Sequence, residues 1–124
     1  MAPLETRNAK LYRTEEDILI SRVKENEHET LADARENAAA LLKLKGADAT
    51  LPLLVDFSKA SGQDADTRKF YAEESVKWTH RVALLVNSPV ARVMGNIYMG
   101  LNKPMVATRL FTDEKEALAW LKSN

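Results

Sequence analysis

The polar residues best placed to do chemistry follow apolar stretches that have the composition of buried strands. Asp56 and Ser58 come after one such stretch, Asn87-Ser88 after the next, and Thr112-Asp113 after the last. Ligands of open α/β sheets bind beyond the carboxyl ends of the strands, so these groups are candidates to line a small polar cleft. In the alternative, which we favour, Asp56 braces its loop while Ser88 and Thr112 cap helices, because helix starts need side-chain caps.

A second candidate surface involves the segment that follows Ser88. Arg92 and Asn96 fall between its apolar positions, and Asn102 and Arg109 come after it. These side chains suit a partner or small-ligand surface, whereas an ordinary solvated face is the simpler interpretation, since single surface residues need no functional explanation. The predicted ligand or partner surface comprises six residues: Asp56, Ser58, Arg92, Asn96, Asn102 and Arg109.

Familiar catalytic and metal-binding signatures are missing from the sequence. There is no cysteine, which excludes thiolate zinc sites and cysteine nucleophiles. His28 and His80 have no ligand-type partner at helical spacing, and Gly95, Gly100 and Lys103 lack the Gly-Lys-Ser/Thr ending of a phosphate-binding loop. We therefore predict no catalytic residues, no metal, no cofactor and no enzymatic activity.

Size and charge narrow the possible functions. The 124 residues are 45% hydrophobic and 29% charged, which predicts one domain over residues 1–124 with a single core. Eighteen basic and eighteen acidic residues give no net charge, which argues against nucleic-acid binding because phosphate contacts need a basic excess. No apolar stretch approaches the ~18–20 residues of a membrane span and the N-terminus has no apolar signal core, so we expect a cytoplasmic protein.

The elements that must position the candidate residues alternate between strand-like and helix-like stretches. Hydrophobic periodicity and turn residues predict strands at 9–14, 18–23, 51–57, 81–87 and 105–111, and helices at 30–46, 64–79, 88–101 and 112–121. Thr30 and Asp33 have the spacing of a capping box, and Gly46 suits a left-handed helix end. The predicted N-caps are Thr30, Asp64 or Asp66, Ser88 and Thr112.

The element order is ββαβαβαβα, with the first two strands paired as a hairpin. Each strand–helix–strand unit requires parallel strands, and its crossover should be right-handed. Right-handed crossovers between strands that are adjacent in sequence order place their helices on one face of the sheet. We therefore expect the other face to be partly uncovered and to be buried in a symmetric homodimer.

Three stretches resemble the STAS / SpoIIAA-like superfamily, within which the chain is most similar to small stand-alone bacterial proteins of unknown function. They are Pro52-Leu53-Leu54-Val55-Asp56 with Ser58; Val82-Ala83-Leu84-Leu85-Val86 running into Ser88-Pro89; and Gly95-Asn96 through Asn102-Lys103-Pro104, Arg109, Phe111 and Ala117-Leu118-Ala119-Trp120-Leu121. The resemblance implies a SpoIIAA-like four-turn β/α superhelix, with a mostly parallel sheet of about five strands and four helices.

The resemblance also carries expectations about function. Regulatory members of the superfamily are anti-sigma-factor antagonists that bind a kinase and are phosphorylated on a serine after an aspartate, in an Asp-Ser-Ser-Gly type motif. Here Asp64 matches that aspartate, but Ala65 stands at the phosphoacceptor position and is followed by Asp66-Thr67. We expect a regulatory or protein-interaction module without the usual phosphoacceptor serine, with a possible protein partner.

The alternative is a carrier for a small ligand such as a lipid or a nucleotide, because some STAS-like relatives bind such molecules. A pocket at the carboxyl edge of the sheet favours the carrier, and a flat apolar surface favours the interaction module.

Overall fold

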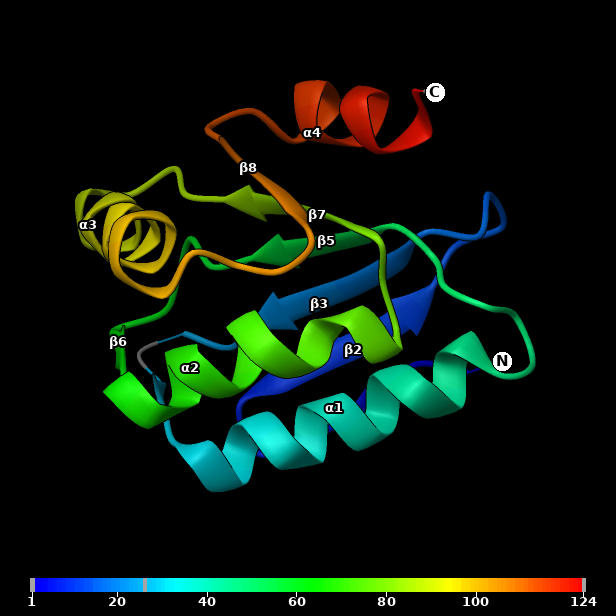
Figure 1. Ribbon diagram of the computed structural model, residues 1–124, viewed down its shortest axis with the longest axis horizontal. Helices are drawn as coiled ribbons and strands as arrows, with labels where there is room; N and C mark the ends of the chain where they lie inside the picture. Colours follow the sequence, from blue (N-terminus) through cyan, green and yellow to red (C-terminus); the bar gives the residue numbers. More distant parts are fainter. Residues whose placement is uncertain (1, 26, 124) are drawn as a thin grey trace.

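The computed structural model describes residues 2–25 and 27–123, and it has a six-stranded sheet with helices on both faces (Figure 1). The strand order is β1-β2-β3-β5-β7-β8, antiparallel from β1 to β3 and parallel from β3 to β8. The strands of this sheet are β1 (Leu4–Glu5), β2 (Ala9–Arg13), β3 (Leu19–Val23), β5 (Leu53–Asp56), β7 (Arg81–Leu85) and β8 (Ala107–Phe111).

A short parallel ribbon stands apart from the main sheet and joins β4 (His28–Glu29) to β6 (Gly62–Gln63). The helices are α1 (Leu31–Lys45), α2 (Ala65–Glu74) with a 3₁₀ turn at Ser75–Lys77, α3 (Pro89–Ile97) with a π-helical turn at Tyr98–Asn102, and α4 (Glu114–Lys122). None of the helices in the described ranges is both long and apolar enough to cross a membrane.

The architecture confirms the predicted α/β class, the four helices and the mostly parallel sheet. The predicted count of about five strands is too low, because the two-residue strand β1 pairs with β2 at one edge of the sheet. The ribbon of β4 and β6 was not predicted either. Two-residue strands are too short for an alternating pattern to show in a sequence.

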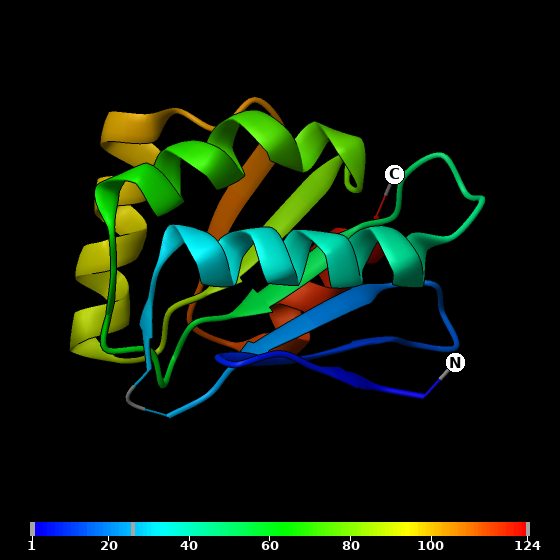
Figure 2. The ribbon, with the colours of Figure 1, turned by 90° about the horizontal axis from the view of Figure 1, so that it is seen from below.

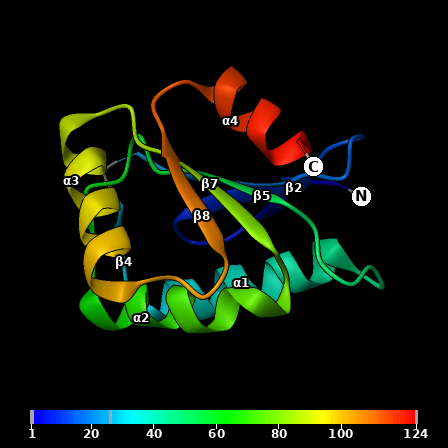
Figure 3. The same ribbon diagram turned by 45° about the horizontal axis from the view of Figure 1, so that its top comes forward.

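Helices α1, α2 and α3 cover one face of the sheet, and α4 packs on the other (Figures 1 and 3). Helix α4 covers the part of that face formed by β5, β7 and β8, while Glu5 and Lys10 at the β1–β2 end of the same face are exposed. Helix α4 follows the last strand and connects to no further one, so no crossover confines it to the face of the other helices. Its Ala117 and Leu121 pack on a buried cluster that includes Leu54, Ala83 and Phe111.

The helix ends follow the predicted caps in part. Thr30 and Asp33 form the expected capping box, and Ser88 accepts a hydrogen bond from the amide of Ala91. Asp64 precedes α2, but no cap hydrogen bond from its side chain is present, because its carboxylate contacts the His28 ring at 2.6 Å.

The N-cap of the last helix is Asp113 and not the predicted Thr112. The Asp113 carboxylate accepts a hydrogen bond from the amide of Glu116. A carboxylate at this position also interacts favourably with the helix dipole, which a hydroxyl does not.

Helix α3 packs against the sheet through small residues. The helical spacing of its larger apolar residues had predicted that these would make the contact. Ala91 and Gly95 are its buried positions, while Val90 and Val93 are 50% and 58% exposed. A Cβ atom on Gly95 would lie 3.1 Å from Val86 and 3.2 Å from Leu110. The glycine thus lets α3 approach the carboxyl ends of β7 and β8 closely, on the side of the sheet that also carries α1 and α2 (Figure 2).

Candidate functional site

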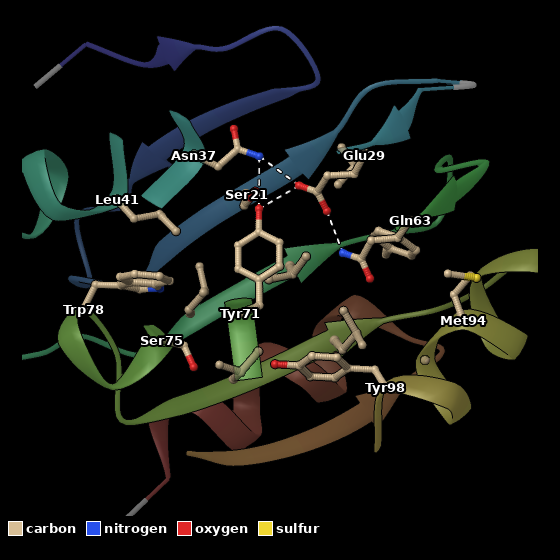
Figure 4. A pocket seen from close by; sticks show the side chains of 17 residues that line it. Ser21, Glu29, Asn37, Leu41, Gln63, Tyr71, Ser75, Trp78, Met94 and Tyr98 are labelled. Atoms are coloured by element: carbon tan, nitrogen blue, oxygen red, sulfur yellow. Dashed lines mark hydrogen bonds between the residues drawn. The ribbon is translucent and has the colours of Figure 1, made fainter. Parts of the chain in front are cut away.

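A cavity of about 70 Å³ lies between the sheet and its three-helix face, and we call it the central cavity (Figure 4). Its floor is formed by β3, β5 and β7, and its walls by α1, α2 and α3 with their attached turns. The floor consists of Ser21, Val23, Leu53, Val55, Phe57, Val82 and Leu84. Leu41, Tyr71, Trp78, Met94 and Tyr98 are among the wall residues, so the lining is mainly apolar.

The central cavity is partly open to solvent. Val55 lies on a strand that has neighbours on both sides, yet it is only half-buried, as are Met94 and Tyr98 on α3 and its π-helical turn. Solvent therefore reaches the middle of the sheet between α2 and α3. A single water molecule needs only ~10–15 Å³ of such volume, so the space admits a small molecule or the end of a longer one.

Four polar side chains form a hydrogen-bonded group at one end of the cavity, and we call it the polar cluster: Glu29, Asn37, Gln63 and Tyr71. The Glu29 carboxylate is almost completely buried, with the residue 2% exposed. It accepts hydrogen bonds from the Gln63 amide at 2.6 Å, the Tyr71 hydroxyl at 2.7 Å and the Asn37 amide at 3.0 Å.

Local structure explains how the polar cluster is assembled. The β4–β6 ribbon sets Glu29 directly opposite Gln63, and Asn37 faces inward from the second turn of α1. Burial raises the pKa of the Tyr71 phenol well above its ordinary value, and the nearby Glu29 charge raises it further. Tyr71 therefore stays protonated at neutral pH and donates its hydrogen bond to the carboxylate.

Two residues that line the cavity carry a buried polar atom with no hydrogen-bond partner among the described residues. The polar groups are the Ser75 hydroxyl and the Trp78 indole N–H, on residues that are 4% and 1% exposed. Both belong to the turn that ends α2, where the Trp78 amide donates to the Ser75 carbonyl at 3.1 Å. Buried donors are nearly always paired in proteins, and an unpaired one calls for a physical explanation such as strain or a functional role.

The cleft predicted at the carboxyl edge is filled by an ion-pair group. Arg22 donates to Asp56 at 3.0 Å and to both carboxylate oxygens of Glu114, at 2.6 and 3.1 Å. Asp56 also accepts a hydrogen bond from the Ser58 amide at 3.2 Å, so it braces its loop as in the structural alternative. The structure therefore does not place Asp56 and Ser58 in the central cavity.

Three other predicted residues do come together, at a different place. Arg92, Asn96 and Arg109 line an open depression of about 340 Å³ between α3, β8 and the start of α4. Arg109 also lies over the Phe111 ring at 5.3 Å. Asn102 is not part of this depression and belongs to the π-helical turn.

Comparison with models of known protein families shows to which family the chain belongs. A family model described as a domain of unknown function, DUF7793, matches residues 12–124. The chain belongs to the DUF7793 family. A search of curated proteins finds no match.

Solved structures show what the DUF7793 chain resembles in fold. One is an uncharacterised protein of the DUF3478 family from Shewanella loihica PV-4, described as having a SpoIIAA-like fold, with 18% identity, 91% of each chain covered and a TM-score of 0.63. The likeness shows a SpoIIAA-like fold and nothing about function. A protein of unknown function from Arthrobacter sp. FB24 shares 29% identity over 92% of this chain and 99% of that one, with a TM-score of only 0.34.

The residues of the central cavity in this DUF7793 chain were not predicted from the sequence. One signal was available: Asn37 interrupts the apolar face formed by Ala34, Ala38 and Leu41, and it is 2% exposed. A polar residue on a buried helix face requires polar partners. Nothing in the His28-Glu29 dipeptide indicates that the glutamate is buried.

Proposed function

We propose that this domain binds a small molecule in the central cavity and acts as a small-ligand carrier or sensor. The supporting observation is an apolar, partly open cavity above the central strands β3, β5 and β7, with unpartnered buried donors on residues of its wall. Binding sites of this kind are concave and mainly apolar, with a few convergent polar groups that fix the orientation of the ligand. We infer that the β/α units also form the four-turn superhelix of SpoIIAA-like proteins.

The experiment that tests this function combines extraction with substitution. The natively purified protein is denatured and its extract is analysed by mass spectrometry, and ligand-observed NMR measures binding of a panel of small alcohols, ketones, amides and carboxylates. Val55→Phe should fill the cavity from its floor and abolish binding, because no free volume remains above β5. Val93→Phe is the matched control, since Val93 is 58% exposed and lies outside the cavity.

Each outcome is decisive for the proposed function. Binding by the wild type and by Val93→Phe, lost in Val55→Phe, supports it. If the extract contains no specific molecule and no member of the panel binds the wild type, the proposed function is wrong.

A second candidate function is a self-associating interaction module without a catalytic role, in which copies meet through the outer side of α3. Its support is a set of exposed apolar side chains on α3 and the segment after it: Val90 at 50%, Val93 at 58%, Leu101 at 78% and Met105 at 68% exposure. Exposed apolar groups that gather on one surface mark interaction sites. The neighbouring strand β8 ends the sheet, and no described strand pairs with its outer edge.

A further inference from the structure

The cavity wall offers donors that need an acceptor. The Ser75 hydroxyl and the Trp78 indole N–H are both more than nine-tenths buried and have no partner in the described part of the chain. Figure 4 shows both side chains at the same end of the cavity, on the far side of Tyr71 from Gln63. An indole N–H can only donate, so its partner must carry an oxygen or nitrogen with a free lone pair.

The opposite end of the cavity carries a negative charge. The three hydrogen bonds to Glu29 all come from uncharged groups, the side chains of Asn37, Gln63 and Tyr71. No ion pair joins Glu29 to a basic side chain among the residues that the structure describes. The Glu29 carboxylate is therefore hydrogen-bonded by uncharged side chains and has no direct ion pair, and it lines this end of the cavity.

We propose that the central cavity selects an uncharged, mainly apolar molecule with one hydrogen-bond acceptor, such as an alcohol, a ketone or an amide, and that it rejects carboxylates and phosphates. The acceptor binds to Trp78 and Ser75, and the apolar part lies on the floor formed by residues such as Val55 and Leu84. This inference rests on the proposed function, because it names the class of ligand for the same cavity.

The size of the charge effect follows from Coulomb's law. Two like charges about 6 Å apart, at the effective dielectric constant of about 20 that suits protein sites, repel strongly enough to weaken binding about 100-fold. Nucleotides are excluded for the same reason, since their phosphates are anionic. The two ends of the cavity thus act together, with donors attracting a neutral acceptor and Glu29 repelling an anion.

The test compares two probes with the same chain length, 1-hexanol and hexanoate, at neutral pH. The readout is the NMR signal of the Trp78 indole N–H, because a hydrogen bond to the ligand shifts that proton. The chain has two tryptophans, and the variant Trp120→Phe identifies which signal belongs to Trp78. We expect 1-hexanol to shift the Trp78 signal in a saturable manner and hexanoate to bind at least about 30-fold more weakly.

Two variants separate the charge effect from the hydrogen bond. Glu29→Gln keeps the shape and should tighten hexanoate binding by about 10-fold or more, while changing 1-hexanol binding less than about 3-fold. Trp78→Phe keeps the apolar ring and should weaken 1-hexanol binding about 5–10-fold, because a net hydrogen bond is lost. Trp120→Phe is its matched control and should leave 1-hexanol binding unchanged, since Trp120 lies outside the cavity. If Glu29→Gln does not fold, the comparison of the two probes on the wild type and on Trp78→Phe still decides the question.

The outcomes distinguish this inference from the function on which it rests. Hexanoate binding as tightly as 1-hexanol, or 1-hexanol binding that Trp78→Phe leaves unchanged, overturns the ligand class but leaves small-molecule binding intact. No saturable shift with either probe, in a protein that also fails to bind any member of the wider panel, overturns both.

Discussion

At the amino end of α1, Arg7 holds Asp33 in place through two hydrogen bonds from its guanidinium group. Its Nε and Nη2 atoms donate to the two carboxylate oxygens at 2.6 and 2.5 Å. The Asp33 side chain is only 5% exposed, and it also completes the capping box with Thr30. These bonds hold the pKa of the Asp33 carboxyl well below its usual range, chiefly through Arg7.

The first prediction concerns Arg7→Gln. A carboxyl whose pKa is lower in the folded than in the unfolded state stabilises the fold above its unfolded pKa, near 4, and loses that contribution as the pH falls. The variant should lower the free energy of unfolding at pH 7, because the Asp33 carboxylate loses its charged partner. Urea denaturation from pH 7 to pH 2 should show the difference shrinking below about pH 4.

The control for this prediction is Lys122→Gln, which removes an exposed pair with Glu16 whose carboxylate side chain is 64% exposed. It should change the free energy of unfolding by less than about 0.5 kcal/mol. An Arg7→Gln effect that stays constant down to pH 2 would show that Asp33 is not the group responsible.

The second prediction concerns phosphorylation near the start of α2. Ala65 stands where the family resemblance places the phosphoacceptor serine, and the hydroxyl of nearby Thr67 is buried and donates to the Glu29 carbonyl at 3.4 Å. Because neither residue offers an accessible hydroxyl, an anti-sigma-type kinase should leave the protein unmodified in a mass-spectrometric assay. Phosphate found on Thr67 or on the exposed Ser61 would contradict this expectation.

The candidate residues that the sequence suggested show why chemistry is hard to assign at the residue scale. Asp56 stands at the strand end, as expected, but its carboxylate binds Arg22, which comes from a strand that carries no catalytic signal. Glu29, which lies beside the cavity, was placed in a polar dipeptide between two predicted elements. Whether a side chain is buried depends on the helices and strands that pack against it. These lie far away in the sequence, so the residues next to it do not reveal its burial.

At the scale of elements, α3 illustrates how packing overrides an apolar pattern. Its larger apolar residues recur at helical spacing, but the contact with β7 and β8 is made through Ala91 and Gly95, where the backbone can approach most closely. The start of the helix was predictable, because Ser88 and Pro89 act locally. The face it buries was not, because that choice depends on the shape of the sheet.

The third prediction compares Gly95→Ala with Gly100→Ala. Both gain helix propensity, worth up to about 1 kcal/mol, but only the Cβ at position 95 meets neighbours, at 3.1 Å from Val86 and 3.2 Å from Leu110, while nothing lies within 4 Å at position 100. Gly95→Ala should therefore be less stable than Gly100→Ala by about 1–3 kcal/mol, the cost of overpacking. Thermal unfolding of the two variants measures this difference, and equal stability would show that α3 shifts freely.

At the scale of the whole molecule, the order of elements was predictable because three strand–helix–strand units admit few topologies. The parallel order β3-β5-β7-β8 and the helices α1 to α3 on one face agree with that logic. The place of α4 could not be deduced in this way, because a terminal helix is free to cover either face. Helix α4 covers part of the sheet face whose exposure was the predicted reason for dimerisation.

We propose that self-association uses a different surface, on the outer side of α3. The outer side of α3 exposes Val93 and Leu101, and no described strand pairs with the outer edge of β8. Exposed apolar side chains and an unpaired strand edge each favour association with a second copy. The formal net charge of zero adds no long-range repulsion between copies.

The last prediction is that the protein forms a homodimer through this surface. Light scattering at micromolar concentration should give about twice 13.9 kDa. Val93→Glu combined with Leu101→Glu should return a monomer, because each interface would then bury two pairs of unpaired carboxylates. Leu42→Glu, on the outer side of α1 at 40% exposure, is the matched control and should remain dimeric. A monomeric wild type, or a dimer that survives the double substitution, would show that the outer side of α3 is an ordinary exposed surface.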